Sequence, residues 1–405
     1  MKILAFSEGP NPKRGGMGIV SVEQQCKAFS ARGHDVLLHT GDITLRSSLP
    51  THPNEMPSRE EAGTPILHFK ECRHRAFGDW QFAPGMSVYL PQRARYVDAI
   101  FLHSLYSYPV LAGYLAARLH HVPYLLWPKG VLAPFQRSMN RSRKYVYDMV
   151  IGRRILDNAS AIVFSADGER EETRPLNLTA PSVVIPLGFD PTPYDHLPPR
   201  GPFRTRYFGN HTGPLILFLG RLNAKKGLDI LAAAVARVAQ RIPDVRLAVV
   251  GAGDPPQFTD RVHSWLEEYG ITDRTVLTGR LTGQDKLAAL ADADVFALPS
   301  QAENFGFAVF EAMACRVPVV IADTLNYAAE VQRRFAGQVV RRDPDEFAKG
   351  IVEVLTDPQY RERLAKHGLQ MISAYTWEKS SELLERTLKC ILQRVPLPTD
   401  LTGGL

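Results

Sequence analysis

Residues 215–250, LILFLGRLNAKKGLDILAAAVARVAQRIPDVRLAVV, contain two apolar segments separated by an amphipathic one. The outer segments, Leu215–Leu219 and Arg246–Val250, are almost continuously apolar, which is typical of buried parallel strands. Between them, the apolar residues of Leu228–Ala239 recur at helical spacing. A strand, a helix and a second strand in this order predict a parallel sheet covered by helices.

The same alternation begins at the start of the chain. Lys2–Phe6 has the composition of a strand. One face of the helix expected next is apolar and consists of Ile19, Val22, Cys26 and Phe29. Further strands are expected at Val36–Thr40, Thr275–Thr278, Val295–Leu298 and Val317–Ala322. The fold class predicted is therefore α/β, with two domains that each contain a Rossmann-like parallel sheet.

Length and a Pro-rich stretch set the expected domain limits. At roughly 100–200 residues per domain, a chain of 405 residues favours two domains. We expect an N-terminal domain at 1–190, a linker at 186–202 and a C-terminal domain at 203–374. Residues 186–202 are interpreted as a linker because they are rich in proline and their apolar residues recur at neither helical nor strand spacing. Residues 54–65 are expected to be a mobile polar insertion, and residues 396–405 a frayed tail.

Composition and charge exclude several classes of protein. The 45% hydrophobic and 22% charged residues exclude collagen-like, coiled-coil and largely disordered chains. No apolar run approaches the roughly 18–20 residues of a membrane span, and the N-terminal apolar stretch is too short for a signal peptide, so a cytoplasmic protein is expected. The four cysteines form no Cys-x-x-Cys pair, which argues against a zinc site or a disulfide framework. Most of the net charge of +6 lies in the first half, which favours a phosphate-rich partner; we expect no nucleic acid.

Two loops carry residues suited to an anionic ligand. In open α/β sheets, ligands bind beyond the carboxyl ends of the strands. The strand at 215–219 is followed by Arg221 and Lys226, whose cationic groups suit a diphosphate. A later loop carries Glu303, and a helix is expected to start near Phe305. Glu311 would lie about two turns into this helix, where it could accept both hydroxyls of a ribose. A solvated basic loop and a surface pair of glutamates are the alternative interpretations.

A glycine cluster lies between the first strand and its helix. Gly15, Gly16 and Gly18 would allow close backbone approach to a phosphate at the helix N-terminus. A flexible turn without a ligand explains them equally well. Neither this cluster nor the Gly-Ala-Gly at 251–253 has the complete Gly-x-Gly-x-x-Gly fingerprint of dinucleotide-binding proteins, which weakens an oxidoreductase hypothesis.

Further motifs surround these residues. In the second half they are Gly-Arg-Leu at 220–222 with Lys226-Gly227, Ala-Asp-Ala-Asp-Val-Phe-Ala-Leu-Pro-Ser at 291–300, and Glu303 and Glu311 separated by seven residues. In the first half they are Gly-Gly-Met-Gly at 15–18, Ala-Arg-Gly-His-Asp-Val at 31–36 and Pro-Lys-Gly-Val-Leu-Ala-Pro at 128–134. This set resembles the family-four retaining glycosyltransferases, which have the GT-B fold, and the last motif resembles a polysaccharide-building branch. The resemblance covers most of the chain apart from residues 42–95.

The resemblance implies two Rossmann-like domains facing each other across a cleft, with a nucleotide-sugar donor held by the C-terminal domain. Arg221 and Lys226 match its diphosphate clamp. Glu303 matches the carboxylate at the donor sugar, and Glu311 the ribose contact. The other implied donor contacts are Gly15, Gly16, Gly18, Arg280, Leu281, Asn304, Phe305, Gly306 and Phe307. A helix at 375–395 is expected to cross back to the N-terminal domain. Transfer with retention, without a metal ion or another cofactor, is also implied.

The sequence departs from the family pattern in several places. Arg316 stands where a glycine is usual, and Thr324–Tyr327 replaces a Gly-rich turn near the nucleotide. Many members have a histidine where this chain has Trp-Pro-Lys at 127–129, so His103 and Lys129 are the acceptor-side candidates. A structural role for His103 is the alternative.

Asp292-Ala293-Asp294 has the spacing of a metal motif from a different glycosyltransferase fold. Its place between a helix end and a buried strand favours a capping or surface role. No metal site is therefore expected here.

The function expected is transfer of a hexose-type sugar from a UDP- or GDP-sugar to a glycan or lipid-linked glycan in cell-surface polysaccharide synthesis. A sugar-nucleotide epimerase or hydrolase on the same fold and a non-catalytic nucleotide-sugar-binding protein are the alternatives. Residues 136–154 carry many cations interleaved with tyrosines and aliphatic residues, which suits a peripheral position on an anionic membrane surface. The alternative is an ordinary helix whose apolar face packs on the first domain.

Overall fold

The computed structural model describes most of the chain, and its internal contacts divide it into two units. The described residues are 1–8, 17–42, 66–70, 80–209, 211–397 and 399–402. Unit 1 comprises Met1–Gly188 and Thr376–Leu405, and unit 2 comprises Phe189–Tyr375. Much of the Pro-rich stretch at 186–202 thus lies in unit 2, where Phe189 and Tyr194 are buried. The insertion expected at 54–65 lies outside the described residues.

Unit 1 contains a parallel sheet with the strand order β3-β2-β1-β4-β5-β6-β7. Its strands are β1 Lys2–Ser7, β2 Asp35–Asp42, β3 Ile66–Lys70, β4 Ala99–His103, β5 Tyr124–Trp127, β6 Ala161–Phe164 and β7 Ser182–Val184. The neighbouring strands pair in parallel throughout this order. The order reverses between β1 and β4, and such a switch point is where open α/β sheets bind ligands.

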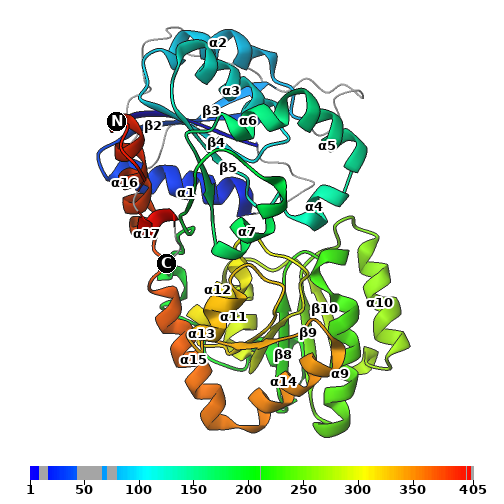
Figure 1. Cartoon of the computed structure of the whole chain (residues 1–405). Helices are drawn as coiled ribbons and strands as arrows, with labels where there is room; N and C mark the ends of the chain where they lie inside the picture. The colour runs from blue at the N-terminus through cyan, green and yellow to red at the C-terminus, as the bar shows by residue number, and fades with distance from the viewer. Residues whose placement is uncertain (9–16, 43–65, 71–79, 210, 398, 403–405) are drawn as a thin grey trace. The chain divides into compact units, whose positions relative to one another are not determined.

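Helices cover both faces of this sheet, as Figure 1 shows. They are α1 Met17–Ala31, α2 Pro84–Ala94, α3 Tyr108–His120, α4 Pro134–Ser138, α5 Arg141–Tyr147, α6 Arg153–Asp157, α7 Asp167–Glu172, α16 Trp377–Gln393 and α17 Thr399–Thr402. Ile3 and Ala5 of β1 pack on one face, in a core shared with α1 and α16. Leu4 and Phe6 pack on the other face, with α2 and α3. Burial on both faces explains why this strand is continuously apolar.

Unit 2 repeats the architecture with the strand order β10-β9-β8-β11-β12-β13. Its strands are β8 Leu215–Leu219, β9 Arg246–Val250, β10 Thr275–Gly279, β11 Val295–Leu298, β12 Val319–Ala322 and β13 Gln338–Val340. Its helices are α8 Pro202–Phe208, α9 Leu228–Arg241, α10 Phe258–Glu268, α11 Gly283–Asp292, α12 Phe307–Ala314, α13 Ala328–Arg333, α14 Pro344–Thr356 and α15 Pro358–Ile372. In Figure 1, α9, α10 and α14 lie on one side of this sheet and α11, α12 and α13 on the other. Two parallel-sheet domains were predicted, and this prediction is confirmed.

The C-terminal residues correct one expectation. Residues 399–402 belong to the tail expected to be frayed, but they form α17. Leu401 is 1% exposed and packs in the same core as Leu383 and Leu384 of α16. A single leucine among polar residues gives no periodic signal, so its burial could not be read from the sequence.

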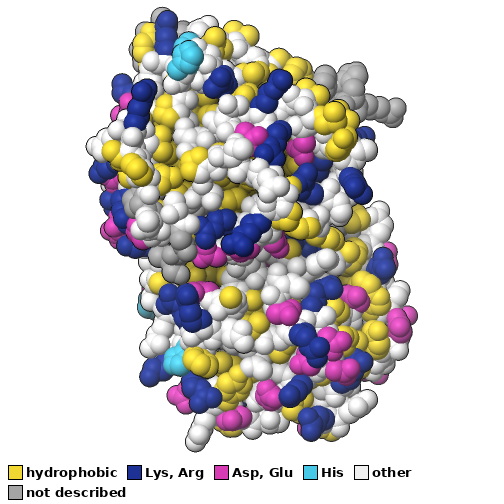
Figure 2. Space-filling model, in the orientation of Figure 1, with side chains coloured by type: hydrophobic (Ala, Val, Ile, Leu, Met, Phe, Trp, Pro, Cys, Tyr) yellow, Lys and Arg dark blue, Asp and Glu magenta, His cyan; other side chains and the backbone are white. Residues whose placement is uncertain are grey.

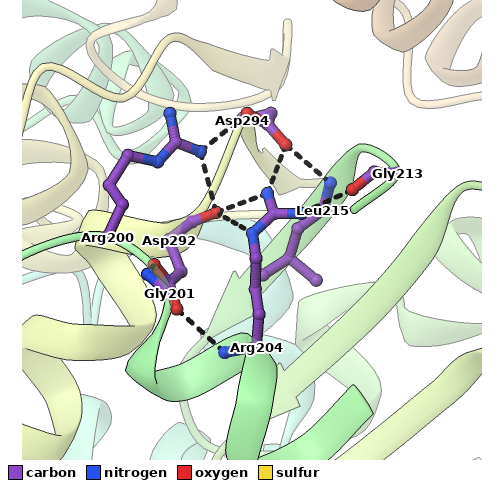
Figure 3. Close-up of polar contacts among 7 residues, drawn as sticks. All are labelled: Arg200, Gly201, Arg204, Gly213, Leu215, Asp292 and Asp294. Atoms are coloured by element: carbon purple, nitrogen blue, oxygen red, sulfur yellow. Dashed lines mark hydrogen bonds and ion pairs between the residues drawn. The ribbon is translucent and has the colours of Figure 1, made fainter. Parts of the chain in front are cut away.

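The Asp292–Asp294 triplet links α11 and β11 to the start of α8, as Figure 3 shows. The fully buried Asp292 carboxylate accepts hydrogen bonds from the backbone N–H groups of Gly201 and Arg204 and thereby caps the N-terminus of α8. Asp294 has three donor residues, which are Leu215, Arg200 and Arg204. A capping or surface role was predicted, and the structure shows that the role is capping. Donors of the protein itself bind both carboxylates.

Candidate active site

The strand order of unit 2 reverses between β8 and β11, and the loops after these strands carry two of the predicted donor residues. Lys226 lies in a 3₁₀ turn after β8, and Glu303 lies after β11. The Nζ atom of Lys226 donates to Oε1 of Glu303 at 2.6 Å. Gly227 permits the close approach of the two loops, because it has a φ of 69° and a Cβ there would clash with the Pro299 carbonyl oxygen. The structure thus places this ion pair at the switch point of the sheet.

The Lys226–Glu303 pair is largely withdrawn from solvent, with side-chain exposures of 14% and 11%. Burial alone would raise the pKa of Glu303, but the positive charges of Lys226 and Lys225 hold this pKa below its ordinary value. A hydrogen bond from Ser300 lowers it further. Glu303 is therefore a carboxylate at neutral pH. Its cationic neighbour Lys226 can also attract a second anion, such as a phosphate.

Helix α12 begins just beyond Glu303. Gly306 is its N-cap, with a φ of 74°, so the helix starts at Phe307 and not at the predicted position near Phe305. The Phe305 ring stacks on Phe310 with 4.3 Å between centroids, so this side chain belongs to the core. The first N–H groups of a helix lack intrahelical partners and favour an anion. Among residues 304–307, backbone groups are thus better placed than the Phe305 ring to contact a ligand.

Glu311 lies on α12 and is only 8% exposed. Its Oε1 atom accepts from Nζ of Lys286 at 3.0 Å, and the same Nζ lies 3.4 Å from the hydroxyl oxygen of Tyr194. Burial and the nearby Glu311 charge raise the pKa of Tyr194. Neither partner of Glu311 was predicted. Lys286 looks in the sequence like any lysine on an amphipathic helix, and Tyr194 lies in the stretch interpreted as a linker.

The remaining donor candidates of unit 2 lie on neighbouring loops. Arg221 follows β8, as does Lys226, but its guanidinium pairs with Asp254 at 2.7 Å and is about half exposed. Arg280 and Leu281 follow β10, where Arg280 is exposed and Leu281 partly exposed. The backbone N–H of Gly251, just after β9, donates to the carbonyl oxygen of Gly279, the last residue of β10. These residues lie at the same carboxyl edge of the sheet as the Lys226–Glu303 pair.

In unit 1, the glycine cluster is only partly described. Gly15 and Gly16 lie outside the described residues, and Gly18 lies in the first turn of α1. At the switch point of this sheet, Ser104 after β4 donates its hydroxyl to Oε1 of Glu8 after β1 at 2.8 Å. This hydrogen bond joins the two loops, just as the Lys226–Glu303 ion pair joins the corresponding loops of unit 2.

The acceptor-side candidates differ in their surroundings. His103 is 1% exposed and stacks on Trp127 with 5.0 Å between ring centroids. Burial, with a contribution from Lys129, holds the pKa of His103 well below its ordinary value, so the ring is neutral. Lys129 is partly exposed and donates to the Ser21 hydroxyl at 3.1 Å. Burial lowers the pKa of Lys129 to about 8. Lys129 is thus the more accessible of the two.

Within the part of the chain that the structure describes, no group of three or more His, Cys, Asp or Glu side chains is placed to hold a metal ion.

Two sequence families match this chain. The family described as "Glycosyl transferase 4-like domain" matches residues 15–188, and "Glycosyl transferases group 1" matches residues 203–371. Together they span most of the chain, and with the two parallel sheets they define a glycosyltransferase of the GT-B fold. The chain belongs to the family-four glycosyltransferases.

Individual relatives agree with this assignment. D-inositol 3-phosphate glycosyltransferase of Corynebacterium jeikeium is 26% identical over 304 residues, which are 70% of this chain and 71% of that protein. Phosphatidyl-myo-inositol mannosyltransferase of Mycobacterium tuberculosis is 29% identical over 186 residues, or 44% and 48% of the two chains. The solved structure of Anabaena HepE, in complex with UDP and glucose, matches with a TM-score of 0.72 at 20% identity and covers 96% of this chain and 99% of its own.

Proposed function

We propose that this glycosyltransferase moves a hexose-type sugar, with retention, from a UDP- or GDP-sugar to a glycan or lipid-linked glycan acceptor in cell-surface polysaccharide synthesis. The observation that carries the proposal is the Lys226–Glu303 pair at the switch point, next to the N-terminus of α12. The UDP and glucose bound by Anabaena HepE support such a donor. The inositol-containing acceptors in the names of two relatives support a polar or lipid-borne acceptor hydroxyl.

The proposed chemistry follows the charges that develop during transfer. As the nucleoside diphosphate leaves, negative charge grows on its β-phosphate and positive charge on the anomeric carbon. Lys226, Arg221 and the N–H groups of α12 suit the first charge, and the carboxylate of Glu303 suits the second. The leaving phosphate can accept the proton of the acceptor hydroxyl on the same face, which retains the configuration. Protein cations here stabilise the diphosphate, so the proposed reaction is independent of a metal ion.

The remaining proposed contacts follow from the family match. Arg280 and Leu281 hold the base, Glu311 holds the ribose, and the acceptor binds unit 1, near the loop of Lys129. The glycine cluster of unit 1, with Gly18 in α1, contributes phosphate contacts.

A thermal-unfolding panel with UDP, GDP and ADP tests the donor site. UDP or GDP should stabilise the protein by about 2.7 kcal/mol when present at 100 times its dissociation constant, and ADP should stabilise it much less. Failure of both UDP and GDP to raise the unfolding temperature at millimolar concentration would contradict the proposed donor.

Residues 136–154 supply a second part of the proposal, because this segment exposes apolar and basic side chains together. The apolar side chains that are half exposed or more are Met139, Tyr145, Val146, Met149 and Val150. Arg141 and Arg143 on α5 are also exposed. Figure 2 shows apolar and basic side chains close together over α4 and α5. Lys144 does not join this surface, because its amino group donates to the Gln136 carbonyl oxygen and lies 5.1 Å from the Tyr106 ring centroid.

We propose that this surface docks on an anionic membrane leaflet. The apolar side chains would enter the headgroup region, and each well-placed cation would add up to about 1 kcal/mol. None of the helices in the described ranges is both long and apolar enough to cross a bilayer. Co-sedimentation should give binding that increases with the fraction of anionic lipid and decreases with salt.

The double variants Met149→Ser with Val150→Ser and Arg141→Gln with Arg143→Gln should each weaken this binding about tenfold. The matched control is Leu115→Ser with Leu119→Ser, because these leucines on α3 are exposed to a similar degree, 52% and 61%. Equal recovery of the wild type in the supernatant with and without anionic vesicles at low salt would exclude the membrane contact.

A further inference from the structure

Tyr327 is a buried tyrosine whose hydroxyl has no hydrogen-bond partner within the described part of the chain. The residue is 5% exposed, and its ring packs edge-on against Phe310 with 5.9 Å between centroids. A phenylalanine would provide the same ring packing. A buried hydroxyl without a partner costs free energy, so its presence calls for an explanation in a different state of the site.

The hydroxyl of Tyr327 lies close to Gly306, in the loop that carries Glu303. A Cβ atom on Gly306, three residues beyond Glu303, would clash with this hydroxyl oxygen. After burial, the largest influence on the pKa of Tyr327 is the charge of Glu303, which raises it. The loop itself contains a second unsatisfied polar atom, since Oδ1 of Asn304 is buried without a partner among the described residues. The loop and the tyrosine that packs against it thus each hold an unsatisfied polar atom, which indicates that this loop has another arrangement in which such groups are paired.

Binding of the proposed donor would explain why the loop that carries Glu303 changes its arrangement. The partner of Glu303 in this structure is Lys226, whose amino group donates at 2.6 Å. Under the proposed function, that ammonium turns to the diphosphate of the donor. Glu303 would then keep its charge in a largely buried position without its main partner, which is unfavourable. A hydroxyl that donates to a carboxylate makes a short and strong hydrogen bond.

We propose that Tyr327 is a positioning residue: its hydroxyl donates to the Glu303 carboxylate when Lys226 turns to the donor diphosphate, and it thereby holds Glu303 at the donor sugar. The inference rests on the proposed function. It concerns a turn, Thr324–Tyr327, in which this chain departs from the pattern that its family resemblance implies.

Tyr327→Phe tests the proposal in the full-length protein. Without ligand, the unfolding temperature should stay at the wild-type value or rise, because the variant loses an unsatisfied hydroxyl. The kcat for release of UDP or GDP from its nucleotide sugar should fall about 10- to 100-fold, since a hydrogen bond to a charged group is lost. The acid limb of the kcat–pH profile should move up by about one pH unit, because that bond favours the ionised form of Glu303.

Tyr360→Phe is the matched control, because its hydroxyl is partly buried in the same unit and pairs with Gln338. It should lower the unfolding temperature and leave kcat and the acid limb unchanged. If Tyr327→Phe behaves like this control, its hydroxyl is merely structural and the proposal is overturned. If the wild type releases no diphosphate from UDP- or GDP-sugars, the proposed function fails, and the proposal fails with it. If the wild type and Tyr327→Phe release the nucleoside diphosphate at equal rates, only the proposal for Tyr327 is overturned, and the proposed function stands.

Discussion

Replacement of Lys226 by alanine should lower turnover of the nucleotide sugar by about 10³-fold. The variant loses the cation closest to the proposed leaving phosphate. It also leaves Glu303, which is 11% exposed, without its partner at 2.6 Å. The pKa of Glu303 should therefore rise, which reduces the carboxylate available to the anomeric carbon. Steady-state release of UDP or GDP measures this loss.

The matched control for this variant is Lys366→Ala, since Lys366 is an exposed lysine on α15 of the same unit. It should leave turnover within about twofold of the wild type. Arg221→Ala should have a smaller effect than Lys226→Ala, about 10- to 100-fold, because Arg221 is half exposed and already pairs with Asp254. Near-normal turnover by Lys226→Ala in a folded protein would rule out the diphosphate clamp.

Replacement of Glu303 by glutamine should reduce turnover by about 10²–10³-fold while binding of free UDP or GDP stays within about threefold. The amide cannot stabilise the positive charge at the anomeric carbon, whereas Lys226 remains available to the diphosphate. Because the pKa of Glu303 lies below its ordinary value of 4.5, the difference between variant and wild type should be full above about pH 4.5. It should shrink as the pH falls through the lower folded-state pKa, where the wild-type carboxyl is also neutral.

Calorimetry separates the roles of the two glutamates. Glu311→Gln should weaken the binding of free UDP or GDP, because Glu311 is the proposed ribose contact. Glu362→Gln, an exposed change on α15, is the control and should alter neither binding nor turnover. Loss of nucleotide binding in a folded Glu303→Gln protein would show that the two roles have been assigned wrongly.

Much of the fold could be predicted, because its strands are defined by local composition. β8, β9 and β11 begin and end at the predicted residues, since each is a short apolar run that a turn or a helix follows. Helix α12 begins later than predicted, because its N-cap Gly306 has a left-handed conformation that the sequence does not distinguish from a helical glycine. Local pattern therefore defines where elements lie better than where they start.

The candidate site could be predicted only in part. Lys226 and Glu303 were named from their charge and their places after predicted strands, and the family resemblance added their roles. Their contact joins loops that the strand order brings to one edge. The Lys286–Glu311 pair and the buried Tyr327 hydroxyl depend on packing between helices and turns distant in sequence, for which no local signal exists. His103 looked like a residue available to an acceptor, but it lies in the core against Trp127.

A crystal structure of the protein with UDP or GDP tests the central claim most directly. The proposal predicts the β-phosphate within hydrogen-bond distance of Lys226 Nζ and of backbone N–H groups at the start of α12, with the ribose hydroxyls on Glu311. Lys226 should have left Glu303, whose carboxylate should face the position of the donor sugar. A diphosphate bound elsewhere in unit 2, with the Lys226–Glu303 ion pair intact, would contradict the account.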